Sequence, residues 1–107
     1  MTRYGSVLRI KPEAIERYKT YHAAVWPEVL EALRVANVHN YSIYLRDDYL
    51  FGYYEYHGTS FEADMVEMAK NPKVKEWWSI MEPMQSPLEN RNPGEWWASM
   101  QEVFHMD

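Results

Sequence analysis

The chain has 107 residues, and its sixteen acidic and eleven basic side chains give a net charge of −5. This length predicts a single domain that spans residues 1–107. Because Lys and Arg are nowhere clustered, nucleic acids and anionic membranes are poor partner candidates. The absence of cysteine excludes disulfides and thiolate nucleophiles. Together with the lack of a signal peptide or a membrane span, it favours a cytoplasmic protein.

Aromatic side chains are unusually frequent. Nine Tyr, five Trp and three Phe make up 16% of the chain, although its 47% hydrophobic and 25% charged fractions are those of an ordinary globular protein. A small core does not need so many rings that carry a polar tip. We therefore expect some of them to line an interface or a pocket.

The first third of the chain predicts a strand followed by a broken helix. Alternating residues over Arg3–Ile10 indicate the strand. Pro12 suits the first turn of the following helix, because a proline there loses no hydrogen bond. Pro27 interrupts the helical pattern, so we expect a kink or break near Ala24–Trp26. A second helical piece then runs from Pro27 to about Ala36.

A β-hairpin follows and is the clearest local signal in the chain. His39–Arg46 and Tyr49–Tyr56 are both rich in aromatic and branched side chains, which favour strands. Asp47 and Asp48 separate the two segments and predict the turn, whose type the sequence leaves open because no glycine is present.

Two helices and a last strand complete the predicted order. Thr59 and Glu62 form a capping box before the first helix, for which Ser60 is another N-cap candidate. Asn71 and Pro72 are typical of the cap and first turn of the second helix. A proline-rich stretch after it predicts an irregular loop. The predicted bounds are Phe61–Lys70 and Lys73–Met81 for the helices and Met100–Met106 for the strand.

This order, βαββαβ, predicts an α+β domain of the ferredoxin-like split βαβ type. Such a domain has one antiparallel sheet with helices on one face. The other face of the sheet then has no cover within the chain. Because the chain is so aromatic, we expect a second copy to cover that face in a two-fold homodimer, a dimeric α/β barrel.

Metal and nucleotide sites are not indicated. The four histidines, at positions 22, 39, 57 and 105, show none of the spacings that are typical of metal ligands. The chain has only four glycines and no glycine-rich loop, so we expect no nucleotide held by a backbone cradle.

Tyr18 and His22 are the most informative pair. They lie four residues apart on the first helix and therefore on the same face. An imidazole titrates near neutrality and can transfer protons, and a neighbouring phenol can orient a hydroxyl group by hydrogen bonding. The spacing alone favours a structural pair that ends the helix before Pro27.

The adjacent Trp77 and Trp78 point about 100° apart on a helix, so they cannot both point to the centre of the core. Both can belong to a wide core-facing stripe. Alternatively, one indole lies in the core and the other at the edge of a cavity, where its flat face can stack on sugar C–H groups.

Three further groups of aromatic residues have open roles. Tyr41 lies on the opposite face of its strand from Asn40, and it either packs in the sheet or offers its hydroxyl to a substrate oxygen. Trp96 and Trp97, in the proline-rich loop, plug that loop against the body or a partner. A last cluster is expected to pack in the sheet and consists of Tyr53, Tyr54 and Tyr56.

Over nearly all its length the chain resembles the L-rhamnose mutarotases. The resemblance rests on the opening strand followed by KPEAIERYKTYHAAVWPEV, on HNYSIYL, on NPKVKEWWSIM and on the closing QEVFHM. The string Y-x-x-x-H-x-x-x-W-P-E, combined with the later W-W pair, is the specific part.

This resemblance implies a dimeric ferredoxin-like domain that interconverts the α and β anomers of a 6-deoxy sugar without a metal or a cofactor. The histidine that the family assigns as proton donor corresponds to His22. The family's substrate contacts correspond to Tyr18, Tyr41, Trp77 and Trp78.

One segment departs from the family pattern. Between the tryptophan helix and the last strand, the family typically has a loop close to NPDNSP, whereas this chain has QSPLENRNPGEWWASM. A loop beside a sugar pocket commonly sets specificity for hydroxyl groups. L-fucose is therefore an alternative to L-rhamnose. A non-catalytic sugar-binding dimer is a further alternative, and the fold alone also admits a cofactor-free monooxygenase or a haem-degrading domain.

Mutarotation requires a base at the anomeric hydroxyl and an acid at the ring oxygen. We expect His22 to transfer the proton at the anomeric end, while the second group is unassigned and could be a tyrosine, a carboxylate or water. We further expect these side chains to converge on a hollow between the uncovered sheet and the broken first helix.

Overall fold

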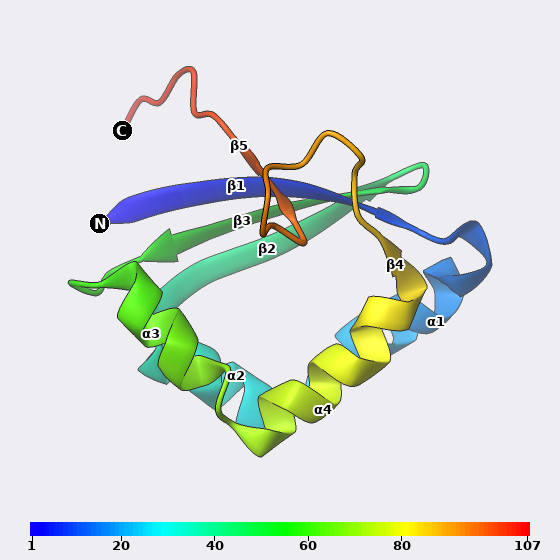
Figure 1. Ribbon diagram of the computed structural model, residues 1–107, viewed down its shortest axis with the longest axis horizontal. Coiled ribbons are helices and arrows are strands. Elements are labelled where there is room, and N and C mark those ends of the chain that lie inside the picture. The colour runs from blue at the N-terminus through cyan, green and yellow to red at the C-terminus, as the bar shows by residue number, and fades with distance from the viewer.

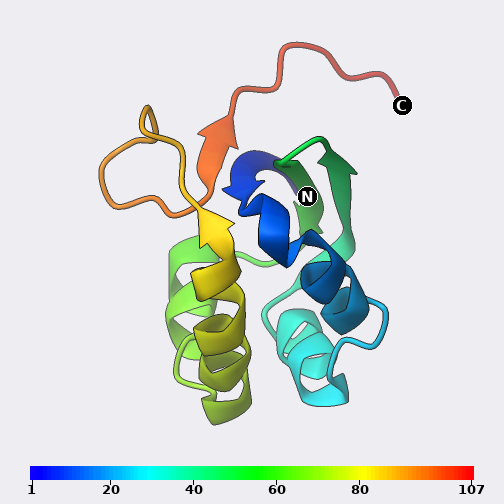
Figure 2. The ribbon, with the colours of Figure 1, turned by 90° about the vertical axis from the view of Figure 1, so that its right-hand side faces the viewer.

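The computed structural model describes residues 1–107 and shows an α+β fold with one curled antiparallel sheet. All helices lie on one side of this sheet (Figures 1 and 2). The strand order is β2-β3-β1-β4, and β5 also pairs with β1. The elements are β1 (Thr2–Ile10), α1 (Ile15–His22), α2 (Pro27–Val35), β2 (Val38–Arg46), β3 (Tyr49–Tyr56), α3 (Phe61–Met68), α4 (Pro72–Met81), β4 (Gln85–Ser86) and β5 (Ala98–Met100), with 3₁₀ turns at Pro12–Ala14 and Glu82–Met84.

The predicted split βαβ order is confirmed, and prolines divide each of its two helical arms. Pro27 is the first residue of α2, and α1 ends at His22, so the chain breaks over residues 23–26 as predicted. Pro72 likewise begins α4 after the end of α3. A proline in a first turn loses no helical hydrogen bond, whereas further inside it would remove one. None of the helices is long and apolar enough to cross a membrane.

The caps of α3 and α4 are side chains from the residues just before each helix. Asn71 caps α4 as predicted, because its Oδ1 accepts hydrogen bonds from the backbone N–H groups of Lys73 (2.9 Å) and Val74 (3.4 Å). The capping box at Thr59 is not formed. Ser60 caps α3 instead, and its Oγ accepts from Ala63 N (3.4 Å). The chain thus enters α3 one residue later than the box requires.

The β2–β3 hairpin contains a bulge. Val38 and His39 pair with Tyr56 and Glu55, but the next pair is Ser42 with Tyr53, so Asn40 and Tyr41 together oppose one residue. Asn40 has φ +49°, a left-handed conformation that asparagine tolerates better than most residues. In the turn that follows, Asp47 has φ +55° and so takes the left-handed conformation that a glycine commonly has in a tight turn.

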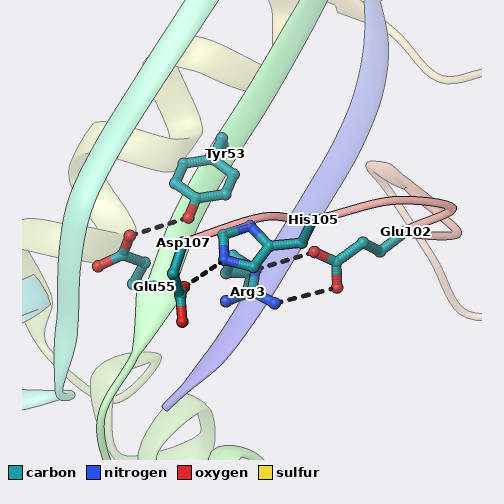
Figure 3. Close-up of polar contacts among 6 residues, drawn as sticks. All are labelled: Arg3, Tyr53, Glu55, Glu102, His105 and Asp107. Carbon is teal, nitrogen blue, oxygen red and sulfur yellow. Dashed lines mark hydrogen bonds and ion pairs between the residues drawn. The ribbon is translucent and has the colours of Figure 1, made fainter.

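The predicted last strand, Met100–Met106, is wrong. Regular pairing ends at Met100, and β5 consists only of Ala98–Met100 opposite residues 5–7 of β1. Beyond it Glu102 reaches β1 through side chains: its carboxylate accepts from Arg3 at 2.9 and 3.4 Å (Figure 3). The alternating pattern describes only side chains, and a strand also needs a neighbour with free backbone groups. Val103, Phe104 and Met106 lie exposed instead.

The core lies between the helices and one face of the sheet. Leu8 and Ile10 of β1, Leu50 of β3, and Trp77 and Met81 of α4 are all buried there. Tyr4 and Ser6 share this face with Leu8 and Ile10, because side chains alternate along a strand. The helix-covered face therefore has a packed end, near Leu8, and a second end where the side chains border a cavity.

Candidate functional site

A cavity of about 600 Å³ lies between the helix-covered face of the sheet and the helices. This volume is in the range of sites for small molecules. The expected hollow therefore exists, but it lies on the covered face of the sheet. The prediction that the hollow lies against the uncovered face is wrong. The strand side chains that border the cavity are on the same face of the sheet as the buried Leu8 and Ile10, because side chains alternate along a strand. All five residues assigned by resemblance line it: Tyr18, His22, Tyr41, Trp77 and Trp78.

His22 ends α1 and stands half-buried on the cavity wall. Its Nδ1 lies 2.9 Å from the backbone carbonyl oxygen of Tyr18. A carbonyl can only accept, so Nδ1 carries the proton and Nε2 is left with a lone pair. Burial lowers the pKa of His22, while the bond to the Tyr18 carbonyl opposes that shift. The imidazole is thus a neutral base whose tautomer is set by its own helix.

Aromatic rings enclose this imidazole on two sides. The Tyr18 ring stacks on it with a centroid distance of 4.2 Å, and the Trp77 ring meets it edge-on at 5.4 Å. Trp77 is itself held by Trp26, just before Pro27, at 5.1 Å. The break between α1 and α2 therefore has His22 at its start and Trp26, whose indole supports Trp77, at its end.

Trp77 and Trp78 take different environments, as one of the two sequence interpretations expected. Trp77 is 6% exposed and belongs to the hydrophobic core. Trp78 is 36% exposed and borders the cavity at its rim. An indole at a cavity rim presents an apolar face to a ligand while remaining anchored by its helix. Stacking of either ring on a sugar remains a prediction.

The β2 bulge brings Tyr41 to the cavity. By simple alternation from the inward-facing Val38, Tyr41 would face outward, but the extra residue at Asn40 reverses the direction. The Tyr41 ring lies 5.3 Å from that of Tyr54 on β3, another cavity residue. Burial raises the pKa of both phenols, that of Tyr54 to about 12. Both hydroxyls therefore stay protonated at neutral pH and can donate hydrogen bonds.

The β4–β5 loop, residues 87–97, closes another side of the cavity, and its two tryptophans pack against the protein's own body. Trp97 packs on the core, and a ring carbon lies 3.3 Å from where a Cβ would stand on Gly52. The lack of a side chain at Gly52 thus provides the space for the Trp97 indole. The indole Nε1 of Trp96 donates to Gln85 Oε1 (2.8 Å), and Gln85 Nε2 lies 3.2 Å from the Tyr18 hydroxyl.

Sequence reasoning missed several cavity residues. Tyr53 and Tyr56 lie outside the cavity lining, consistent with packing in the sheet, but Tyr54 borders the cavity. Its place on the inward face follows from the same alternation as that of Tyr56, so this signal was present in the sequence. Gln85 lies in the two-residue strand β4 and Glu95 in the β4–β5 loop, and neither segment is long or regular enough to carry a periodic signal. No three His, Asp or Glu side chains converge closely enough to hold a metal ion.

Comparison with known proteins identifies the family. A family model described as L-rhamnose mutarotase matches residues 3–106. The L-rhamnose mutarotase of Lactiplantibacillus plantarum is 37% identical over 109 residues, an alignment that covers 100% of both chains. The chain belongs to the L-rhamnose mutarotase family.

Solved structures agree with this mutarotase fold. The crystal structure of an L-rhamnose mutarotase from Formosa agariphila has a TM-score of 0.78 and 25% identity, with 100% of both chains covered. Tetracenomycin F2 cyclase of Streptomyces glaucescens, a type-II polyketide cyclase, has a TM-score of 0.71 and 14% identity, with 100% of this chain and 98% of that chain covered. The second likeness concerns the fold alone.

Proposed function

We propose that this protein is a mutarotase that interconverts the α and β anomers of L-rhamnose. Membership of the L-rhamnose mutarotase family supports the reaction and the sugar. The observation that carries the catalytic role is the His22 imidazole, held as a neutral base on the wall of an aromatic cavity. Acid–base chemistry alone can open a sugar ring, so the proposal needs no cofactor. The lack of cysteine is consistent with a place in the cytoplasm.

The reaction begins at the anomeric hydroxyl. Nε2 of His22 takes the O1 proton, and the electron pair left on O1 forms the aldehyde C=O. The C1–O5 bond breaks as O5 takes a proton from a second group at the ring oxygen, which is a tyrosine, a carboxylate or a water molecule. The C1–C2 bond then rotates, and O5 attacks the other face of the aldehyde. The O5 proton returns to the second group while the proton on His22 returns to O1. A positioned acid or base typically accelerates such a step by about 10²–10⁴-fold.

The cavity must hold the sugar by its distal part and leave C1 free to rotate. Tyr18 and Tyr41 provide hydroxyl groups for sugar oxygens, and Trp78 provides an apolar face at the rim. Trp77 touches the same space but is mostly occupied in supporting His22. These contacts are proposed as the binding site, with His22 as the catalytic residue.

We also propose that the protein works as a homodimer whose sheets face each other. The outer face of the sheet carries an apolar row in register across three strands: Tyr44 on β2, Phe51 on β3 and Val7 on β1. Tyr44 is 68% and Phe51 38% exposed. The segment after β5 leaves the sheet on this same side, away from the helices (Figures 1 and 2), and exposes Phe104. A second copy of the chain would cover these surfaces.

Magnetisation-exchange NMR on the anomeric protons tests the proposed function. The protein is added to L-rhamnose, L-fucose and D-glucose in parallel, and each exchange rate is compared with the spontaneous rate in the same buffer. We expect the largest acceleration for L-rhamnose. A larger acceleration for L-fucose would overturn the choice of sugar. Tryptophan quenching by L-rhamnose without any accelerated exchange would indicate a sugar-binding protein and contradict the enzyme.

A further inference from the structure

Three side chains from distant parts of the chain form a hydrogen-bonded series that ends in the cavity. Trp96, in the β4–β5 loop, donates through Nε1 to Oε1 of Gln85 at 2.8 Å. Gln85, the first residue of β4, lies 3.2 Å from the Tyr18 hydroxyl through its Nε2. Gln85 is a buried polar side chain, 7% exposed, and both its amide nitrogen and its amide oxygen have a hydrogen-bond partner.

The chemistry of the indole sets the direction of the whole series. Nε1–H of Trp96 can only donate, so the atom of Gln85 that faces it must be the carbonyl oxygen. The amide NH₂ group then faces Tyr18 and must donate to its hydroxyl oxygen. The Tyr18 hydroxyl proton is therefore turned away from Gln85, and no protein group accepts it. Because Tyr18 lines the cavity, this proton is available to a bound ligand.

The β4–β5 loop is anchored on both sides of Trp96, which keeps the indole in place. On one side the Glu95 carboxylate accepts from Asn92 N (3.0 Å) and Ser99 Oγ (2.6 Å). On the other side Trp97 is packed against the core beside Gly52. A donor that is half-exposed but fixed by its neighbours can thus determine the orientation of a buried amide.

We infer that Gln85 and Trp96 are positioning residues that hold the Tyr18 hydroxyl as a hydrogen-bond donor toward an oxygen of the sugar. This inference rests on the proposed function and adds two residues, from the part of the chain that departs from the family pattern. The rings of Tyr18 and His22 are stacked with their centroids 4.2 Å apart, so the donor and the base belong to the same part of the cavity wall. Burial raises the pKa of Tyr18, which keeps the hydroxyl proton in place at neutral pH.

The Gln85→Glu substitution reverses the direction of the hydrogen bond between residue 85 and the Tyr18 hydroxyl, with little change in the shape of the side chain. A carboxylate can accept from Trp96 but cannot donate to Tyr18, so the Tyr18 hydroxyl must donate to the carboxylate and offers only a lone pair to the sugar. We expect kcat for L-rhamnose to fall about tenfold, as for the loss of one hydrogen bond to a buried group. Asn90→Asp makes the same change of charge at an exposed position of the same loop and should leave kcat unchanged.

A double-mutant cycle separates positioning from a merely structural role. If Gln85 acts through the Tyr18 hydroxyl, Gln85→Glu costs kcat about tenfold in the unsubstituted protein and less than about twofold in a Tyr18→Phe background. Trp96→Phe, which frees the amide to rotate without placing a charge in the core, should show the same dependence on Tyr18 with a smaller loss. Thermal unfolding of each variant checks that the fold persists.

The same cycle is also measured by titrating the unsubstituted, Tyr18→Phe, Gln85→Glu and doubly substituted proteins with L-rhamnose and following tryptophan fluorescence. Equal losses in both backgrounds, in kcat and in Kd, would overturn the inference and leave the proposed function intact. Sugar binding without exchange in the unsubstituted protein would contradict the proposed function, while the cycle in Kd would still decide the role of Gln85. Failure of the unsubstituted protein to bind L-rhamnose would overturn both.

Discussion

Hydrogen bonds within the protein determine which atoms of His22 and Tyr18 are free to act on a ligand. The Tyr18 carbonyl occupies Nδ1 of His22 and leaves Nε2 as the base. Gln85 occupies one lone pair of the Tyr18 hydroxyl and leaves its proton free. In both cases the side chain itself could act as donor or acceptor, and a neighbour selects one of the two functions.

The pH dependence of the reaction follows from the state of His22. Burial holds its pKa below the ordinary value of about 6.5, so the neutral base persists into mildly acidic solution. We expect kcat/KM for L-rhamnose to be highest near pH 8, to fall as the pH is lowered and to reach half its maximum below pH 6.5. The rate without protein is measured at each pH and subtracted. A half-maximum above pH 6.5 would be at odds with the buried environment of His22.

Secondary-structure elements bring these residues together through irregularities. Pro27 divides the first helical arm, so that α1 ends at His22 and Trp26 packs against Trp77. The bulge at Asn40 turns Tyr41 toward the cavity, because one additional residue reverses the alternation of the rest of β2. An uninterrupted helix and a regular hairpin of the same length would give the same fold without this arrangement of side chains.

The bulge can be tested at Asn40. Valine is poorly tolerated at φ +49°, so Asn40→Val should reduce stability by about 1–2 kcal/mol in urea unfolding and raise KM for L-rhamnose as Tyr41 loses its orientation. Asn40→Gly keeps the left-handed backbone and loses only the side-chain bond to Glu55, so its KM should stay close to normal. Equal KM values for the two variants would argue against this role of the bulge.

Local sequence signals accounted for the element order and for part of the site. Pro27, Asn71 and the alternation in the hairpin act within a few residues, so their consequences could be predicted. The length of the last strand could not be predicted, because pairing depends on a neighbour that periodicity does not describe. Gln85 was missed for a similar reason: its role arises from Tyr18 and Trp96, 67 and 11 residues away along the chain.

At the scale of the whole molecule, the outer face of the sheet has no cover of its own. Arg3 and Glu102 hold the final segment at the start of β1, and the Glu102 carboxylate has a lowered pKa beside that guanidinium (Figure 3). The ion pair is exposed, so it orients the segment more than it stabilises the fold. Val103, Phe104 and Met106, between 77% and 89% exposed, remain without a partner within the chain.

A charge placed in the centre of the outer face should prevent dimer formation. Phe51→Glu puts a carboxylate in the apolar row between Tyr44 and Val7, where a facing sheet would have to desolvate it. We expect sedimentation to give a dimer for the unsubstituted protein and a monomer for Phe51→Glu. Val35→Glu, at an exposed position of α2, adds the same charge and should remain dimeric. A monomeric unsubstituted protein would remove the basis for the proposed assembly.

The exchange rate of L-rhamnose anomers with the His22→Gln variant tests the central claim most directly. Glutamine keeps a polar group of similar reach at the end of α1 but cannot serve as a base at neutral pH. We predict that the protein-dependent rate falls about 10²–10⁴-fold, while L-rhamnose still quenches tryptophan fluorescence with a Kd close to that of the unsubstituted protein. A rate within a factor of about two of the unsubstituted protein would contradict a proton transfer by His22.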